Sequence, residues 1–146
     1  MNEPRNPNTA LLNFVAKNCQ MGKVSIKQLL PVIEDGEFRR AVESQYREYD
    51  EIDDLAVKAL ARRGAAPDDI GAMAKMSSYL MINAGAIMDN STSHMAEMMC
   101  KGSNQGIVEI TKRLSEHREA EPEAKDLAKR LLSTEEHNLE TMKSYL

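Results

Sequence analysis

The stretch EFRRAVESQYREYDEIDDLAVKALARR, residues 37–63, decides the fold class of this chain. Its apolar side chains recur every three or four residues, which places them on one face of a helix. These apolar positions are Phe38, Val42, Tyr49, Ile52, Ala56 and Leu60. A Glu-Asp-Gly turn at 34–36 precedes the stretch, and Gly64 follows it at the position where glycine commonly ends a helix. The pattern therefore predicts one long amphipathic helix from about Glu37 to Arg63.

Residues that begin or break helices divide the rest of the chain. The first helix is expected to begin at Asn6-Pro7, because asparagine caps helices and proline is favoured at their first position. Pro31 kinks or ends this helix, since proline lacks the N–H that an inner helical turn needs. A third segment is expected over about 67–89, where a proline and two aspartates suit the start of a helix.

The second half of the chain is expected to hold two more long helices. Five cap-forming residues at 89–93 predict a break or a sharp bend there. A fourth helix should follow from about Ser91 to His117. The last helix begins at Glu121-Pro122 and is expected to run to the end of the chain.

These segments together predict an all-α fold. Four of them are similar in length, which is typical of an antiparallel four-helix bundle. The segment at about 67–89 is expected to be an extra one that crosses between the second and third bundle helices. Residues 1–146 are enough for a single domain with one hydrophobic core, and 42% of them are hydrophobic. The chain is therefore predicted to fold as one helical domain.

The charge and the composition exclude several classes of function. The formal net charge is −4 and the Lys and Arg residues are scattered, which disfavours a nucleic-acid or an anionic membrane surface. No apolar run approaches the roughly 20 residues of a membrane span, and the first residues lack the pattern of a secretion signal. Cys19 and Cys100 form no metal or redox motif. We therefore expect a cytoplasmic protein with reduced thiols.

Several polar residues fall on the apolar faces when residues are placed at 100° intervals around each helix. They are Asn18 on the first helix, Gln45, Tyr49 and Asp53 on the second with Glu48 at its edge, Thr92 and Ser103 on the fourth, and Glu135 and Asn138 on the fifth. Gln20 and His137 are predicted to point the other way. A buried polar group without a partner lowers stability, so these groups either hydrogen-bond across the bundle or bind something. In the simpler interpretation they only pair with one another, and Glu135 reaches solvent or a partner.

Two stretches resemble the ferritin-like superfamily. LLSTEEHNLETMKSYL, residues 131–146, resembles the last helix of ferritin-like proteins. AEMMCKGSNQGIVEITKRL, residues 96–114, resembles the third bundle helix of a poorly characterised bacterial branch. The plan of two long helices, a longer connection and two more helices is also similar, so the resemblance covers about the whole chain. It implies a ferritin-like four-helix bundle. Members with a di-iron site use one Glu from each of two helices and a Glu-x-x-His motif from each of the other two.

This chain departs from the di-iron pattern at most of the ligand positions. The last helix has Glu135 followed by Asn138 in place of His, and the second helix has Gln45 and Glu48 in place of Glu and His. The other two helices offer only a neutral amide and a hydroxyl, Asn18 and Ser103. Neutral amides are poor ligands for iron, so the resemblance carries over no ferroxidase activity and no cofactor is expected. If iron or manganese does bind, Glu48 and Glu135 are the candidate ligands.

Glycines and methionines mark two further features. Gly102 and Gly106 lie four residues apart on the expected fourth helix, where each glycine costs about 1 kcal/mol relative to alanine. They predict either the close approach of a neighbouring helix, with Gly22 facing them, or a gap that admits a ligand beside Ser103 and Gln45. The ten methionines are dense around the third segment and suggest a contact between subunits there, with a dimer favoured.

Three hypotheses for the function follow from these features. The first is a non-catalytic ferritin-like bundle that acts as a homo-oligomer or by binding a small partner. The second is a degenerate di-metal protein, binding or oxidative, that uses Glu48 and Glu135. The third is a small-molecule binder with a polar pocket at mid-bundle, formed by Asn18, Gln45, Tyr49, Ser103, Glu135 and Asn138. None of the three involves a nucleic acid or a membrane.

Overall fold

The computed structural model describes residues 6–68 and 89–146, and every regular element within them is helical. The elements are α1 (Pro7–Leu29), the short 3₁₀ helix η1 (Leu30–Val32), α2 (Gly36–Arg62), α4 (Thr92–Glu116) and α5 (Pro122–Lys143). The four long helices agree with the four predicted bundle helices to within a few residues at each end. The segment predicted over about 67–89 lies almost entirely outside the described residues.

The helices begin and end where local signals in the sequence predict. Asn6, Asp35 and Ser91 cap α1, α2 and α4, and each side chain accepts a backbone N–H at 2.8, 2.8 and 3.2 Å respectively. Gly64 follows α2 with a φ of 68°, a conformation that glycine adopts without strain. α5 ends at Lys143, short of the predicted end, because the chain tightens into a turn over its last residues.

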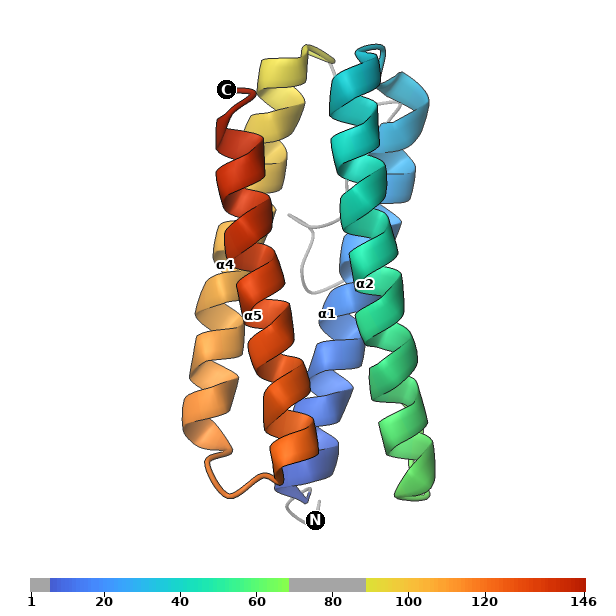
Figure 1. Cartoon of the computed structure of the whole chain (residues 1–146), viewed down its shortest axis with the longest axis vertical. Coiled ribbons are helices and arrows are strands. Elements are labelled where there is room, and N and C mark those ends of the chain that lie inside the picture. Colours follow the sequence, from blue (N-terminus) through green and yellow to red (C-terminus); the bar gives the residue numbers. More distant parts are fainter. Residues whose placement is uncertain (1–5, 69–88) are drawn as a thin grey trace.

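Figure 1 shows how the four long helices are arranged. α1 starts at the end of the bundle that holds the N-terminus, α2 returns to that end, α4 runs in the same direction as α2, and α5 runs back beside α4. α1 packs on α2 and α4 packs on α5, while α2–α5 and α1–α4 contacts join the two pairs. Each of these four contacts is therefore antiparallel. α2 therefore ends and α4 begins at opposite ends of the bundle.

The core lies between the four helices and comes from the predicted apolar stripes. All six residues of the α2 stripe are buried. The residues that meet them from the other helices include Leu11, Leu12, Val15, Leu29, Met95, Ile110, Leu131 and Met142. Burying one such side chain contributes about 1.5–3 kcal/mol, so packing rather than helix propensity holds the bundle together. Within the described ranges, no helix combines the length and the hydropathy needed to cross a membrane.

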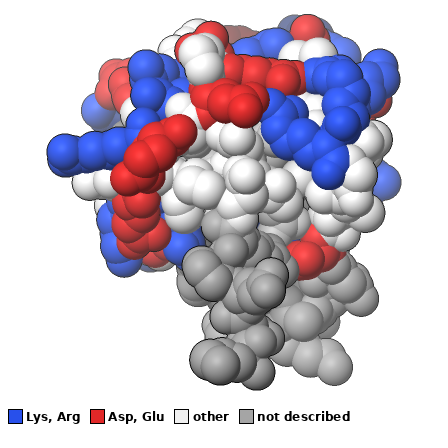
Figure 2. Space-filling model, turned by 90° about the horizontal axis from the view of Figure 1, so that it is seen from below, with Lys and Arg blue, Asp and Glu red and all other residues white. Residues whose placement is uncertain are grey.

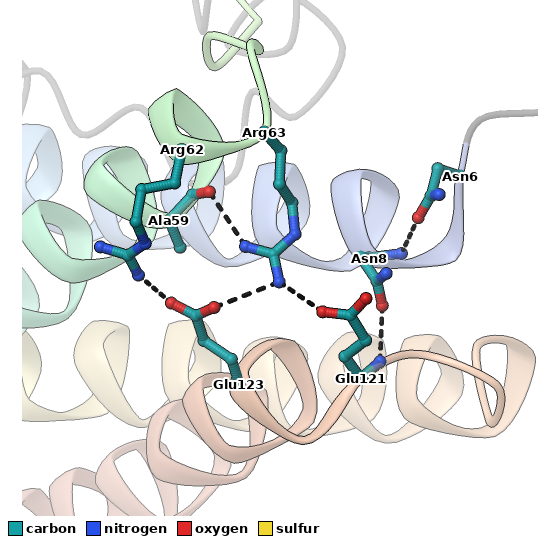
Figure 3. A network of polar contacts seen from close by, with 7 residues as sticks. All are labelled: Asn6, Asn8, Ala59, Arg62, Arg63, Glu121 and Glu123. Atoms are coloured by element: carbon teal, nitrogen blue, oxygen red, sulfur yellow. Dashed lines mark hydrogen bonds and ion pairs between the residues drawn. The ribbon is translucent and has the colours of Figure 1, made fainter.

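Charged side chains join α2 to α5 at the end of the bundle where α2 ends (Figure 3). Arg63 donates to Glu121 at 2.7 Å and pairs with Glu123 at 3.1 Å. The Arg63 guanidinium also donates to the carbonyl of Ala59 at 3.0 Å, and Arg62 pairs with Glu123. Figure 2 views the molecule from this end and shows acidic and basic groups next to one another. These ion pairs hold the end of α2 against the start of α5.

Candidate functional site

A cavity of about 260 Å³ lies between the helices at mid-bundle, and all four long helices contribute to its wall. Its apolar lining consists of Phe14, Met21, Ile26, Leu29, Met98 and Met99. The described polar residues of its lining are Asn18, Ser25, Gln45, Tyr49, Ser103, Gln105, Glu109, Arg113 and Glu135, and Gly22, Gly102 and Gly106 also line it. An apolar wall with a few polar groups that converge on one space is typical of a small-molecule site.

Glu135 of α5 is buried at the cavity wall, with 3% of its surface exposed. Tyr49 of α2 donates its hydroxyl hydrogen to Glu135 Oε1, and Ser103 of α4 hydrogen-bonds the same carboxyl group. Asn138, one turn further along α5, donates to the hydroxyl oxygen of Tyr49 at 3.3 Å. Burial raises the pKa of Glu135 to about 7, and the bonds from Tyr49 and Ser103 only partly oppose this shift. Near neutral pH the group is therefore divided between its protonated and ionised forms.

Two glycines make the space in which Tyr49 and Glu135 meet. A Cβ atom added at Gly22 would lie 2.8 Å from Cε2 of the Tyr49 ring, and one at Gly106 would lie 3.3 Å from the carboxyl carbon of Glu135. The nearest groups are thus side chains from other helices, so the expectation that Gly22 and Gly106 face each other across closely approaching helices is wrong. Burial, and then the neighbouring Glu135, raise the pKa of Tyr49 well above its usual value, which keeps its hydroxyl group a donor.

Gln45 carries a buried hydrogen-bond donor that no described residue accepts. Its side chain is 5% exposed, and its Nε2 atom has no hydrogen-bond partner among the described residues. A buried donor without a partner costs about 1–3 kcal/mol. The Nε atom of Arg113 on α4 likewise has no partner among the described residues. Its guanidinium group lies 5.2 Å from the centroid of the Phe14 ring and donates to Glu116 at 3.2 Å. Both unpaired donors belong to residues of the cavity wall.

Most of the polar residues predicted for a mid-bundle pocket come together here. Those that line the cavity are Asn18, Gln45, Tyr49, Ser103 and Glu135. Asn138 is buried and supports Tyr49 without lining the cavity. The interpretation in which Glu135 reaches solvent is wrong, because the packing of α5 on α2 and α4 encloses it.

Two residues were predicted to point away from the bundle interior. His137 is exposed, as predicted. Gln20 is half-buried and its amide donates to Asp53 of α2 at 3.2 Å, so the prediction for Gln20 is wrong. Lys23, one turn further along α1, pairs with Asp53 at 2.8 Å. The angle around one helix does not reveal how wide its contact with a neighbouring helix is, and here α2 covers the flank of α1 that carries Gln20 and Lys23.

The residues at the di-iron ligand positions do not fit a metal centre. Glu48 accepts hydrogen bonds from Arg130 at 3.1 and 3.3 Å and from Thr134 at 3.3 Å, whereas Glu135 is engaged by Tyr49. In ranges 6–68 and 89–146, no three His, Cys, Asp or Glu side chains come together as a metal ion would require. One buried carboxyl group among neutral amides and hydroxyls is a poor ligand set for iron or manganese.

Sequence reasoning missed the α4 wall of the cavity beyond Gly106. Glu109 and Arg113 line this wall, and neither belongs to the predicted pocket. A signal was present, because positions 106, 109 and 113 recur every three or four residues and so share one helix face. The glycine at 106 marked that face, but the charged residues beyond it resemble those of an ordinary solvated surface.

The described methionines of α4 pack inward. Met95 is buried, and Met98 and Met99 are half-buried on the cavity wall. The others of the predicted cluster lie outside the described residues: Met73, Met76, Met81 and Met88. In the described part of the chain, the large exposed apolar side chains are Leu55 on α2, Val108 on α4 and Leu146 beyond the end of α5. The dimer therefore stays a prediction.

The two cysteines serve as packed side chains in the described structure. Cys19 is buried, and burial followed by the nearby Asp53 raises the pKa of its thiol well above the usual value. Cys100 is half-buried, and burial raises its pKa as well. A raised pKa leaves little reactive thiolate, so both thiols behave as small hydrophobic groups.

Residues 6–68 and 89–146 form an all-α bundle of four long helices, with polar side chains around a cavity between them. Comparison with known proteins finds no match to this chain among protein-family models, curated proteins or solved structures.

Proposed function

We propose that this protein binds a small organic molecule in the cavity between its helices. The observation that carries the proposal is the unused donor of Gln45, which is buried at the wall of the same cavity as Glu135. An apolar side chain at position 45 would give a more stable bundle, because an unpaired buried amide costs about 1–3 kcal/mol. A ligand that accepts a hydrogen bond from Gln45 removes this cost. The amide is therefore better explained by binding than by folding.

The cavity limits the size and the character of the ligand. A cavity of about 150 Å³ in another protein binds benzene, so a volume of about 260 Å³ suits a molecule of about ten non-hydrogen atoms. Phe14, Met98 and Met99 would cover an apolar body. Gln45 and Glu135 would orient a polar end. The proposed ligand thus has an apolar body and at least one hydrogen-bond acceptor.

We also propose that the bundle is ferritin-like in topology. Ferritin-like bundles contain one long crossover connection. Here α2 and α4 run in the same direction, so α2 ends and α4 begins at opposite ends of the bundle. This order of two helices, crossover and two helices supports the resemblance seen in the sequence. In this proposal the small-molecule cavity takes the mid-bundle place that a di-iron site occupies in metal-binding members, with Gln45, Ser103 and Asn138 in place of metal ligands.

Binding of small aromatic probes tests the proposed function. We expect at least one of 2-amino-1-phenylethanol, 1-phenylethane-1,2-diol and mandelate to shift NMR signals of cavity residues in a saturable way. Each probe has an apolar ring and a hydroxyl group that can accept a hydrogen bond from Gln45. The Asn18→Phe variant extends a bulky side chain from the cavity wall, so it should weaken binding by about tenfold or more.

The matched control for this variant is Asn104→Phe, which places the same side chain at an exposed position of α4. Asn104→Phe should bind the probes as the wild type does. If no probe binds the wild-type protein at millimolar concentration, or if Asn18→Phe binds as tightly as Asn104→Phe, the cavity is not a binding site and the proposal is wrong.

Replacing Gln45 by leucine is expected to raise the free energy of unfolding by about 1 kcal/mol, because it removes a buried donor without a partner at nearly constant volume. Asn138→Leu is the matched control, since this buried amide is paired with the Tyr49 hydroxyl at 3.3 Å. The control should lose about 1 kcal/mol. Urea denaturation measures both changes. A loss of stability in Gln45→Leu similar to that in Asn138→Leu would make Gln45 a structural group and contradict its role in binding.

A further inference from the structure

Glu135 faces the cavity without a cationic partner. Its hydrogen bonds come from the uncharged Tyr49 and Ser103, and no Lys or Arg in the described part of the chain forms an ion pair with it. Lys23, on the neighbouring α1, is already engaged by Asp50 at 3.0 Å and Asp53 at 2.8 Å. Buried acidic side chains are rarely left unpaired, because the charge loses its hydration. The bundle thus provides an acidic group at the cavity but not its counter-ion.

The groups around Glu135 are mostly uncharged. α1 contributes the buried thiol of Cys19, α2 contributes Gln45 and Tyr49, and α4 contributes Ser103, Glu109 and Arg113. Glu109 and Arg113 lie about one and two helical turns beyond Gly106, the point at which the Glu135 carboxyl group meets α4. Arg113 pairs with Glu116 at 3.2 Å, and Glu109 accepts a hydrogen bond from Gln105 at 3.4 Å, both within α4. The acidic character at the Glu135 position itself is therefore not cancelled by a neighbour.

The wall next to Glu135 suits a cation with an apolar body. Gly106 has no side chain, so nothing from that position covers the carboxyl group, and an added Cβ would lie 3.3 Å from Oε2. The aromatic rings of Phe14 and Tyr49 line the same space and add to its apolar wall, with the Arg113 guanidinium already 5.2 Å from the centroid of the Phe14 ring. The thioethers of Met98 and Met99 adapt to apolar groups of varied shape. A cation that is otherwise apolar would thus find both its charge and its body matched.

We infer, resting on the binding function proposed above, that the ligand is a small organic amine with an apolar body. Its ammonium group pairs with the ionised carboxylate of Glu135, and an oxygen atom of the ligand accepts the hydrogen bond of Gln45 Nε2. The association is non-covalent. When Glu135 is protonated in the free protein, its proton passes to solvent as the ammonium group enters, because a carboxylic acid has no charge to pair with the cation.

The three probes used above differ at one group and so test the amine class directly. At pH 8, 2-amino-1-phenylethanol is expected to bind about tenfold tighter than 1-phenylethane-1,2-diol, in which a neutral hydroxyl replaces the ammonium group. Mandelate, which has a carboxylate at that position, should bind more weakly than both. The Glu135→Gln variant should lose the preference for the amine and keep most of its affinity for the diol. Glu136→Gln is the matched control at the next, exposed position and should keep the preference.

The pH dependence of amine binding to the wild-type protein is a second readout. The ammonium group stays charged between pH 5.5 and pH 8. Because the pKa of Glu135 is about 7, the amine should bind roughly sevenfold more weakly at pH 5.5 than at pH 8 and so approach the affinity of the diol, which should change little. Calorimetric titrations at the two pH values measure this.

The outcomes separate the amine class from the binding function itself. If the diol or mandelate binds the wild type as tightly as the amine, if the preference survives in Glu135→Gln, or if amine binding is independent of pH, the amine inference is overturned and the binding function stands. If none of the three probes binds, both are overturned.

Discussion

Through Glu135, the free energy of unfolding of the wild-type protein is expected to fall by about 3 kcal/mol between pH 4 and pH 8. The Glu135→Gln variant should not show this fall. Burial raises the pKa of this group from 4.5 to about 7 in the folded protein, and each pKa unit corresponds to about 1.4 kcal/mol. Glutamine has nearly the same shape and can still accept the hydrogen bond from Tyr49. It carries no charge at any pH, so its burial does not become less favourable as the pH rises.

The direction of the effect follows from which state holds the proton. Below about pH 4.5 the carboxyl group is protonated in both the folded and the unfolded chain, so pH has no effect through it. Between pH 4.5 and about 7 the folded chain keeps the proton that the unfolded chain has lost, and stability falls as the pH rises. Above about pH 7 both states are ionised, and the full penalty for the buried charge is present.

Urea denaturation at several pH values measures this difference. The free energy of unfolding of Glu135→Gln minus that of the wild type should increase by about 3 kcal/mol from pH 4 to pH 8. Taking this difference cancels the contributions of the other titrating groups, which both proteins share. Glu136→Gln is the control, since that side chain is exposed, and its difference from the wild type should be nearly independent of pH. Parallel profiles for Glu135→Gln and the wild type would contradict a buried, poorly solvated carboxyl group at position 135.

Replacing Gly22 by alanine is expected to lower the free energy of unfolding by about 1 kcal/mol. Alanine favours the helical conformation over glycine by about 1 kcal/mol, so an open site would become more stable. Here the added Cβ would lie 2.8 Å from the Tyr49 ring, well inside contact distance. The ring is buried, and its hydroxyl group is held by Glu135 and Asn138, so it cannot move aside without breaking those bonds. Overpacking of this kind costs about 1–3 kcal/mol and outweighs the gain in propensity.

Gly106→Ala is the matched control for the clash at Gly22. Its Cβ would lie 3.3 Å from the end of the Glu135 side chain, which has only to yield by a few tenths of an ångström, so its net effect on stability should be near zero. A double variant with Tyr49→Leu tests the cause directly. With the ring absent, Gly22→Ala should become stabilising by about 1 kcal/mol. If Gly22→Ala destabilises equally in both backgrounds, the Tyr49 ring is not the reason for a glycine at position 22.

The helices could be predicted because their signals are local. A cap such as Asn6 or Asp35 acts on a backbone N–H two or three residues away, and Gly64 ends α2 through its own φ angle. The burial of Gln45 and Asn138 could also be predicted, because periodicity within one helix determines which residues share its apolar face. The width of a contact between two helices has no such local signal, which is why Gln20 was assigned to the wrong side.

The helical bundle, the polar residues on its inward faces and their small number of charges could all be predicted from local patterns in the chain. How those polar residues contact one another depends on the packing of the four helices. Tyr49 and Glu135 are 86 positions apart on α2 and α5, and their contact depends on the rotation and spacing of the helices. That spacing in turn depends on which side chains Gly22 and Gly106 admit. The periodicity of a single helix contains no information about either, so the cavity, its unpaired amide and its lone buried carboxyl group appear only when the four helices are packed together.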